Sequence, residues 1–226
     1  MKAKKNIKYL IVLVVIISVW LFLNLKEDYS ETPIKAIEKV KNEVGFILHE
    51  IEVDDGKVLL YSTDTGEDSQ VLNAEYVKKS WLGWKWGYGG VHSFPRYSEH
   101  TIDMSIDPIS YMYFPSTKGT PVGDTPFPMF VGVLNNPDID SISLLSHLTG
   151  EEEIVNIIEG PGYKIWYLFV TKEQGFEFTL KLLSSEGKVL HKEYINEAFL
   201  FEFNGKSIRN QGSGGNTTVE ISPIEE

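Results

Sequence analysis

The chain has 226 residues, of which 42% are hydrophobic, and it carries a formal net charge of −11 at neutral pH. Its first 26 residues hold five of the 21 basic residues and no acidic residue, so the remainder carries 16 basic and 32 acidic residues, a net charge of −16. Because nucleic-acid phosphates need a basic face, this balance argues against nucleic acid as a partner. The chain contains no cysteine, so its stability must come from core packing rather than from disulfides.

The first expected element is a membrane-spanning helix at residues 9–25, YLIVLVVIISVWLFLNL, which form an uncharged apolar run. These 17 residues span roughly 25 Å as a helix, near the short end of what a hydrocarbon core of about 30 Å requires. A cleaved signal peptide and a buried helix of a soluble protein are the alternatives. The run is longer than the usual signal core, and no small-x-small cleavage site follows it, so we expect an uncleaved signal anchor.

Lysines before the apolar run predict its orientation, because the positive-inside rule keeps that side in the cytoplasm. These lysines are Lys2, Lys4, Lys5 and Lys8. Residues 1–8 then form a cytoplasmic stub and residues 26–31 form a short polar stalk. We therefore expect a single-pass protein of the cell membrane, with the lipid bilayer as partner through residues 9–25 and an extracytoplasmic C-terminal part.

A small helix-plus-sheet domain is expected next, over residues 32–115. Thr32 and Pro33 are typical of a helix N-cap and first position, and apolar residues recur at helical spacing up to Gly45, which predicts a helix of residues 33–43. Alternating apolar residues and turn signals, including an Asp-Asp-Gly hairpin turn, then predict an antiparallel meander. The meander has three or four strands, and the candidates are residues 46–53, 57–63, 71–78 and 81–88.

A proline-rich stretch marks the change to a second domain. The expected fold class is α+β, with a helix-plus-sheet domain followed by an all-β unit. Six of the ten prolines lie between Phe94 and Pro128, and because proline lacks a backbone donor this stretch cannot form a central strand or a long helix. We expect a β-sandwich over residues 116–208, for which an immunoglobulin-like topology is one form, and a disordered tail over 209–226. The candidate strands are residues 129–134, 139–148, 153–158, 164–171, 176–183, 188–194 and 198–203.

The most unusual local feature is the aromatic cluster WLGWKWGY at residues 81–88. On a regular strand, Trp84, Trp86 and Tyr88 share one face, and an exposed row of aromatic rings can stack on sugars such as cell-wall glycan. The alternative is that the row forms the core that covers the helix of residues 33–43, and this alternative is favoured because such rows are more often core. The candidate binding residues are Trp81, Trp84, Trp86, Tyr88 and His92.

The histidine and acidic residues do not match a metal-binding pattern, so no metal and no cofactor are expected. His92, His100, Asp103 and Asp107 form H-x₇-H-x₂-D-x₃-D, which is not a zinc spacing. The loop acids near the first hairpin lack the D-x-[DN]-x-[DN]-G pattern of a calcium loop. These acids are Asp54, Asp55, Asp64, Glu67 and Asp68.

The sequence also contains no motif for nucleophilic catalysis, so no catalytic residue is predicted. There is no G-x-S-x-G, no cysteine, no Ser–Lys motif of the penicillin-binding type, and no Walker or Rossmann fingerprint. Gly87, Gly89 and Gly90 follow a strand, but no helix follows them to receive a phosphate.

Residues 32–93 resemble small signal-anchored extracytoplasmic proteins of Bacillus-type bacteria, whose role is unknown. The matching segments are TPIKAIEKV, VGFILHEIEVDDGKVLLY and GWKWGYGGVHS, of which the last is the most specific. The resemblance covers roughly the first third of the outer part. It implies a signal-anchored α+β domain of unknown role and carries over no catalytic residue. A Gram-positive origin is instead suggested by the composition, which lacks cysteine and is rich in Lys, Ile and Glu.

Two functions of different classes follow from these observations. The first is a non-enzymatic interaction module that binds a protein or a wall component, since exposed strand edges recruit partners. The second is a cell-surface enzyme acting on wall glycan, with Asp103 or Asp107 as carboxylates beside the Trp residues. The missing catalytic motifs favour the interaction module over the enzyme, and a structural or stress-related role is a third option.

Overall fold

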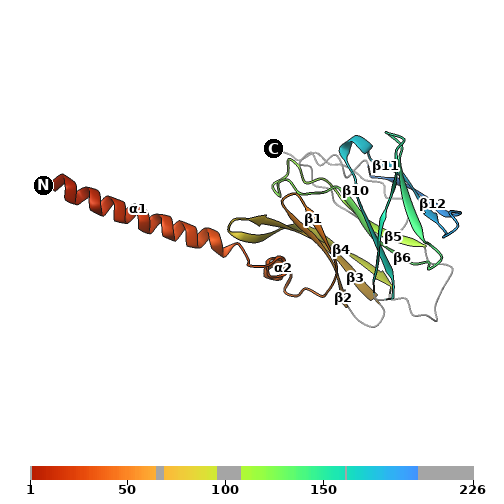
Figure 1. Ribbon diagram of the computed structural model, residues 1–226, viewed down its shortest axis with the longest axis horizontal. Helices are drawn as coiled ribbons and strands as arrows, with labels where there is room; N and C mark the ends of the chain where they lie inside the picture. The colour runs from red at the N-terminus through yellow and green to blue at the C-terminus, as the bar shows by residue number, and fades with distance from the viewer. Residues whose placement is uncertain (1, 65–68, 96–107, 161, 198–226) are drawn as a thin grey trace, which may run out of the picture.

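The computed structural model describes residues 2–64, 69–95, 108–160 and 162–197. In these ranges the chain combines helices with antiparallel sheets, as the predicted α+β class requires. A long helix extends away from a β-rich body, and a short second helix lies beside the first sheet (Figure 1). The body is layered in the order short helix, first sheet, central sheet and outer sheet.

The long helix α1, Lys2–Glu27, contains the apolar run that is expected to enter a membrane. Its described side chains begin at Ile11, and the large apolar ones from Ile11 to Leu25 are 41–63% exposed. Among the described residues, no helix has both the length and the apolar character that crossing a membrane requires. The side chains of residues 2–10, where the predicted anchor starts, lie outside the described part. The membrane anchor therefore stays a prediction.

The short helix α2, Pro33–Lys41, begins where the Thr-Pro signal predicts it. The Lys35 backbone N–H donates to the Thr32 hydroxyl oxygen at 3.2 Å, which satisfies one of the free donors of the first turn. On the opposite side Ile37 is fully buried against the first sheet. The helix ends slightly earlier than predicted, because Asn42 takes a positive φ of 60°, which an α-helix cannot continue through.

The first sheet has the strand order β1-β2-β3-β4, which is the predicted antiparallel meander. The turn at Asp54 and Asp55 joins the first pair of strands, as the sequence indicates. The last two strands are longer than predicted, because they pair along their whole length as one hairpin. The bounds are β1 Phe46–Val53, β2 Gly56–Asp64, β3 Ser69–Ser80 and β4 Gly83–Pro95.

The remaining strands form two further sheets, with the orders β5-β6-β10-β9 and β12-β11-β7-β8. The central sheet contains β5 Ile109–Phe114, β6 Met129–Leu134, β10 Lys164–Phe169 and β9 Asn156–Glu159. The outer sheet contains β12 Val189–Asn196, β11 Glu177–Leu183, β7 Ser141–Ser146 and β8 Glu152–Ile154, and the 3₁₀ turn η1 Lys172–Gln174 precedes β11. Two sheets packed in this way are compatible with the predicted β-sandwich, while the immunoglobulin-like topology stays a prediction.

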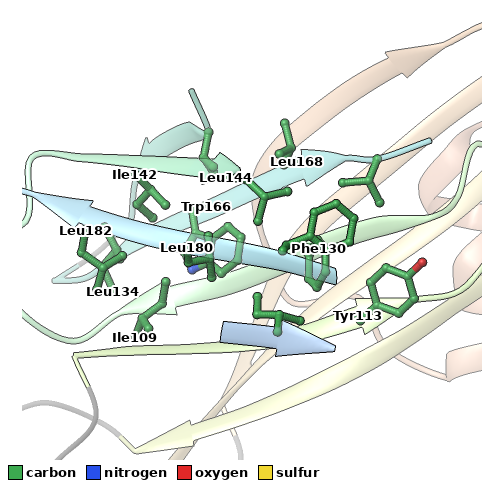
Figure 2. Packing of buried hydrophobic residues seen from close by; sticks show 14 of the residues in the cluster. Ile109, Tyr113, Phe130, Leu134, Ile142, Leu144, Trp166, Leu168, Leu180 and Leu182 are labelled. Atoms are coloured by element: carbon green, nitrogen blue, oxygen red, sulfur yellow. The ribbon is translucent and has the colours of Figure 1, made fainter. Parts of the chain in front are cut away.

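Alternate residues of the central sheet enter two different cores. On β6, Phe130 faces the outer sheet and Val131 faces the first sheet, and every residue of this strand is buried. Burial on both faces explains why β6 has a continuous apolar sequence rather than an alternating one. Figure 2 shows side chains of the central and outer sheets meeting around Trp166 and Leu180. The central sheet therefore holds the whole β-body together.

Strand β5 lies in the proline-rich stretch, where the sequence predicts no strand. Pro108 precedes it and Pro115 follows it, and the strand lies at the edge of its sheet, where the lack of a proline donor is tolerated. It pairs with β6, with Ile109 opposite Leu134, although the boundary predicted at residue 115 separates the two strands. The first and central sheets also share a core, so packing is continuous across that boundary.

The single strand predicted over residues 153–158 is divided between two sheets. Strand β8 pairs with β7 in the outer sheet, and β9 pairs with β10 in the central sheet. Between them, Val155 is buried and its N–H donates to the Ile142 carbonyl oxygen at 2.9 Å. The chain thus crosses from one sheet to the other at Val155. The predicted strand at residues 198–203 and the tail lie outside the described residues.

Candidate functional site

The Trp-rich segment forms the turn of the β3–β4 hairpin and the start of β4. Ser80 pairs with Gly83, so Trp81 and Leu82 make a two-residue turn. The Leu82 N–H donates to the Ser80 hydroxyl oxygen at 3.1 Å. Gly83 has φ of +128°, and a Cβ on it would lie 2.5 Å from the Ser30 carbonyl oxygen. Glycine is therefore required at this turn, which lies directly against the segment that follows α1.

Trp81 projects from the hairpin turn and is 81% exposed. Its ring stacks on Phe22 of α1, with centroids 5.9 Å apart and planes inclined by 25°. Trp81 is therefore not a core residue of the β-body. It joins the hairpin tip to the apolar flank of the long helix.

A β-bulge divides the other aromatic residues between the two faces of the first sheet. The register of β4 against β3 shifts by one residue at Gly87. Trp84 and Trp86 consequently pack on the α2 side, whereas Tyr88 packs on the side of the central sheet. The prediction that these three aromatic residues share one face is wrong, because it assumes a regular strand.

Trp84 and Trp86 belong to the layer beneath α2. Both are partly buried against the small core that contains Ile37 of the helix. The Lys79 ammonium group lies over the Trp84 ring, 5.4 Å from its centre. The two indoles thus cover α2, which is what the alternative interpretation of the aromatic row predicts.

Glu75 of β3 is a buried carboxylate beneath the same helix. Its side chain is fully buried, and the Trp86 indole N–H donates to one carboxylate oxygen at 2.6 Å. The other oxygen lies 3.4 Å from the Lys41 ammonium nitrogen at the end of α2. Burial raises the pKa of the Glu75 carboxyl above its ordinary value, and the Trp86 hydrogen bond and the Lys41 charge act in the opposite direction. A proton-binding group therefore lies between helix and sheet.

Gly89 of β4 lies directly against this carboxylate. A Cβ on Gly89 would lie 1.8 Å from a Glu75 oxygen and 2.7 Å from the Ala74 carbonyl oxygen. We expect Gly89→Ala to lower the free energy of unfolding by about 1–3 kcal/mol, the usual cost of overpacking a closed site. Urea unfolding of the full chain in detergent micelles, followed by Trp fluorescence, measures this loss.

The control for this prediction is a double-mutant cycle with Glu75→Ala, which removes the carboxylate and frees part of the space. The double variant is expected to lose less stability than the sum of the two single variants, because residues in contact are not additive. Strictly additive losses would contradict the close approach of Gly89 to Glu75.

The raised pKa of Glu75 predicts a specific pH dependence. A carboxyl whose pKa is higher in the folded than in the unfolded chain contributes stability that is fully present below its ordinary pKa of 4.5. That contribution is lost as pH rises through the folded-state pKa. We therefore expect the free energy of unfolding of the wild type, minus that of Glu75→Gln, to fall as pH rises from 4.5 towards neutrality. Urea titrations at several pH values measure the difference, and a difference that rises with pH would refute the assignment.

Tyr88 and His92 are partly buried and lie between the first and central sheets. The Tyr88 ring makes edge-to-face contacts with Phe114 at 6.2 Å and Phe127 at 5.7 Å. His92 Nε2 lies 3.1 Å from the Ser110 hydroxyl oxygen on β5. Burial lowers the pKa of the His92 imidazole below its ordinary value, so the neutral ring is favoured. The five predicted binding residues thus occupy three places: the hairpin tip, the α2 side and the core between the sheets.

The polar segment predicted as a stalk, residues 26–31, is bonded to the first sheet. Ser30 and Trp84 exchange two backbone hydrogen bonds, of 2.7 and 2.8 Å. The Asp28 carboxylate pairs with the Lys85 ammonium group at 2.8 Å. We refer to these contacts, together with those of Lys39 described next, as the junction.

Lys39 of α2 completes the junction by capping the C-terminal end of α1. Its ammonium group donates to the carbonyl oxygens of Glu27 and Tyr29, each at 2.7 Å. These carbonyls lack helical partners, and a cation at the C-terminal end of a helix also interacts favourably with the helix dipole. The long helix is therefore fastened to both α2 and the β3–β4 hairpin.

The described residues do not assemble a metal site, since no three histidine, aspartate or glutamate side chains are placed to share an ion. Of the residues whose spacing does not match a metal pattern in the sequence, His100, Asp103, Asp107, Glu67 and Asp68 lie outside the described part of the chain. An open hollow at loops of the outer and central sheets is lined by polar residues, among them Asp138, Asp140 and Lys188. It lies apart from the Trp-rich hairpin, on different elements.

Sequence reasoning missed two features of this region. The first is the buried Glu75 carboxylate beneath α2. Glu75 interrupts an apolar strand on the same face as Val77, and an acid at such a position is the sequence signal that could have revealed the site. The contact between Trp81 and Phe22 joins residues far apart in the chain, and no local pattern predicts it.

Comparisons with protein-family models, with curated proteins and with solved structures find no match to this chain. The resemblance to Bacillus-type signal-anchored proteins stays a prediction. The function is therefore argued from the geometry, in which the junction between α1 and the β-body is the most distinctive part.

Proposed function

We propose that this chain is a single-pass membrane protein whose extracytoplasmic body is a non-enzymatic binding module. Residues 9–25 anchor it in the lipid bilayer, the N-terminal stub lies in the cytoplasm, and the β-body binds a protein or a cell-wall component. The net charge of −16 outside the first 26 residues supports a partner other than nucleic acid.

The observation that carries this proposal is the apolar surface of α1. The large apolar side chains from Ile11 to Leu25 are 41–63% exposed and lie on all sides of the helix. A helix that is apolar all round is stable only inside a protein core or a bilayer. Figure 1 shows that α1 extends away from the β-body, so the body does not supply that core. A bilayer is the environment that suits this surface.

The junction supports a role that needs a defined orientation. A flexible tether would leave the acidic body free to turn, whereas Lys39 and the Ser30–Trp84 pair fasten α1 to two elements of the body. Anchoring would then present the same surfaces of the β-body to the outside. Such an arrangement suits recognition of a partner at a fixed height above the membrane.

Exposed residues on edge strands are the candidate contacts for that partner. Phe46 on β1 is 65% exposed, and Tyr194 on β12 is 56% exposed. Both strands lie at an end of their sheets in the described part of the chain. Strand edges offer unpaired backbone groups to a partner segment, and aromatic side chains add contact area.

Photo-crosslinking in intact cells tests the binding function. A photoreactive phenylalanine analogue at position 46 or 194 of the full chain is expected to give a crosslinked product of defined mass. The matched control carries the same analogue at Val122, which is 46% exposed but lies in a loop. Recovery of only the free chain from positions 46 and 194 would contradict a binding role for these edges.

The wall-glycan enzyme stays an alternative prediction. Its proposed carboxylates, Asp103 and Asp107, lie outside the described residues, and Trp84 and Trp86 pack under α2. Hydrolysis of purified wall glycan by the full chain in detergent would favour this alternative over the binding module.

A further inference from the structure

We propose that the tip of the β3–β4 hairpin, residues 80–83, lies in the interfacial layer of the same bilayer that α1 enters, with the Trp81 ring at the boundary between headgroups and acyl chains. The inference rests on the proposed membrane anchor and extends it. An anchor alone leaves the body free to stand clear of the lipid, whereas this contact makes the outer body a second lipid-binding element.

The contact of Trp81 with Phe22 of α1 sets the depth of the Trp81 ring in the bilayer. The Trp81 ring stacks on Phe22 at 5.9 Å, and Phe22 precedes Glu27, the last residue of α1, by five residues. At about 1.5 Å per residue, the level of Phe22 and Trp81 lies about 7–8 Å from the level of Glu27 along the helix axis. When the charged end of α1 lies among the headgroups, Trp81 lies at the boundary between headgroups and acyl chains.

The chemistry of the tip suits that boundary. Trp81 has the highest exposed fraction, 81%, of the large hydrophobic side chains in the described part of the chain. An indole combines a large apolar ring with one N–H donor, and tryptophan is enriched where a bilayer meets water for this reason. The interface therefore accounts for an aromatic ring that the β-body leaves uncovered.

Basic side chains next to the tip favour lipid phosphates. Lys78 and Lys79 on β3 are both exposed; the Lys78 ammonium group is paired with the Asp55 carboxylate at 2.8 Å, and the Lys79 ammonium group lies 5.4 Å from the centre of the Trp84 ring. The nearby acid Asp28 is paired with Lys85 at 2.8 Å. Cationic side chains just above an apolar ring match the order of headgroup and acyl chain in a bilayer.

The junction keeps the tip in place. Ser30 pairs with Trp84, only three residues after Trp81, so the hairpin cannot swing away from α1 without breaking two backbone hydrogen bonds. A Cβ on Gly83 would also collide with the Ser30 carbonyl oxygen, which shows how closely the turn approaches the chain. Contact between Trp81 and α1 is thus built into the fold.

The test uses the absence of cysteine in the chain, which allows one label per molecule. The full chain with Trp81→Cys carries an environment-sensitive fluorophore and is reconstituted into phosphatidylcholine–phosphatidylglycerol vesicles that contain a headgroup nitroxide lipid. Leu148→Cys is the matched control, because Leu148 is also highly exposed, at 70%, but follows β7 of the outer sheet. Truncation of an exposed side chain leaves no cavity, so both variants are expected to fold.

The nitroxide lipid is expected to quench the label at position 81 several-fold more strongly than the label at position 148. Equal quenching of the two labels, with both chains bound to vesicles, would overturn the hairpin contact and leave the anchor intact. A blue-shifted label at position 81 that the nitroxide does not quench would overturn it as well, because a protein surface or a second copy then covers Trp81. Failure of both chains to sediment with vesicles would refute the anchor itself.

Discussion

Substitution of two residues in the middle of α1 by arginine is expected to release the full chain from membranes. Val15 and Ile16 are 55% and 59% exposed and lie near the centre of residues 9–25. Each arginine near a bilayer centre costs about 2.5–3.5 kcal/mol on insertion scales, so Val15→Arg with Ile16→Arg costs about 5–7 kcal/mol. This shifts the partition between membrane and water by roughly 10⁴-fold. The measurement is the fraction of the chain that sediments with membranes after an alkaline carbonate wash.

The control is the pair Val15→Leu and Ile16→Leu, which keeps the helix apolar and is expected to sediment like the wild type. The near-ultraviolet circular dichroism of the β-body is expected to be the same in both pairs, since the changes lie in the part of α1 that extends away from it (Figure 1). Sedimentation of the arginine pair at the wild-type level would show that α1 is not the anchor.

Trp166→Ala is expected to cause the largest loss of folding stability among single changes in the β-body. Trp166 is fully buried on β10, between the central and outer sheets, and its ring centre lies 6.0 Å from that of Tyr111. Removal of a buried Trp side chain typically costs about 3–5 kcal/mol, which includes the cavity that is left. Because the central sheet also forms a core with the first sheet, the first and outer sheets are expected to lose stability together.

Urea unfolding with two probes checks this expectation. In this variant the emission comes from Trp20 of α1 and from Trp81, Trp84 and Trp86 of the β3–β4 hairpin, so its change on unfolding of the β-body reports on the first sheet. Far-ultraviolet circular dichroism reports on all three sheets. Both are expected to show one transition at the same lowered midpoint in Trp166→Ala. Two separate transitions, with the first sheet unaffected, would contradict a core that is continuous across residue 115.

Trp166→Phe is the matched control for the alanine variant. It keeps an aromatic ring in the core and removes the indole N–H, which is buried without a hydrogen-bond partner among the described residues. Removing a buried donor that has no hydrogen-bond partner removes its desolvation cost, and this gain in stability offsets part of the stability lost with the smaller ring. We therefore expect the phenylalanine variant to lose much less stability than the alanine variant. Equal losses of stability in the two variants would contradict this expectation.

Much of the local structure could be predicted from the sequence, because it depends on short-range signals. The Thr32–Pro33 start fixes where α2 begins, and the apolar patterns, alternating towards the end of β1 and continuous in β6, place both strands correctly. Strand β5 could not be predicted in the same way. Its two flanking prolines argue against a central strand, and only pairing with β6 shows that it is an edge strand.

The candidate site was less predictable, because it depends on one backbone irregularity and on long-range contacts. The bulge at Gly87 reverses the face of every later residue of β4, so Tyr88 and His92 leave the side that carries Trp86. No feature of the local sequence distinguishes this glycine from Gly89 or Gly90. The contact of Trp81 with α1 likewise follows from the turn of the whole hairpin, not from the residues near it.

The central claim, an outer β-body tethered by α1, is tested most directly by labelling single cysteines in intact cells. The full chain carries either Leu148→Cys, on the exposed end of the β-body, or Lys5→Cys, in the predicted cytoplasmic stub. A maleimide that cannot cross membranes is expected to label position 148 in intact cells and position 5 only after permeabilisation. Labelling of position 5 but not 148 in intact cells, or recovery of both chains in the soluble fraction, would contradict the account.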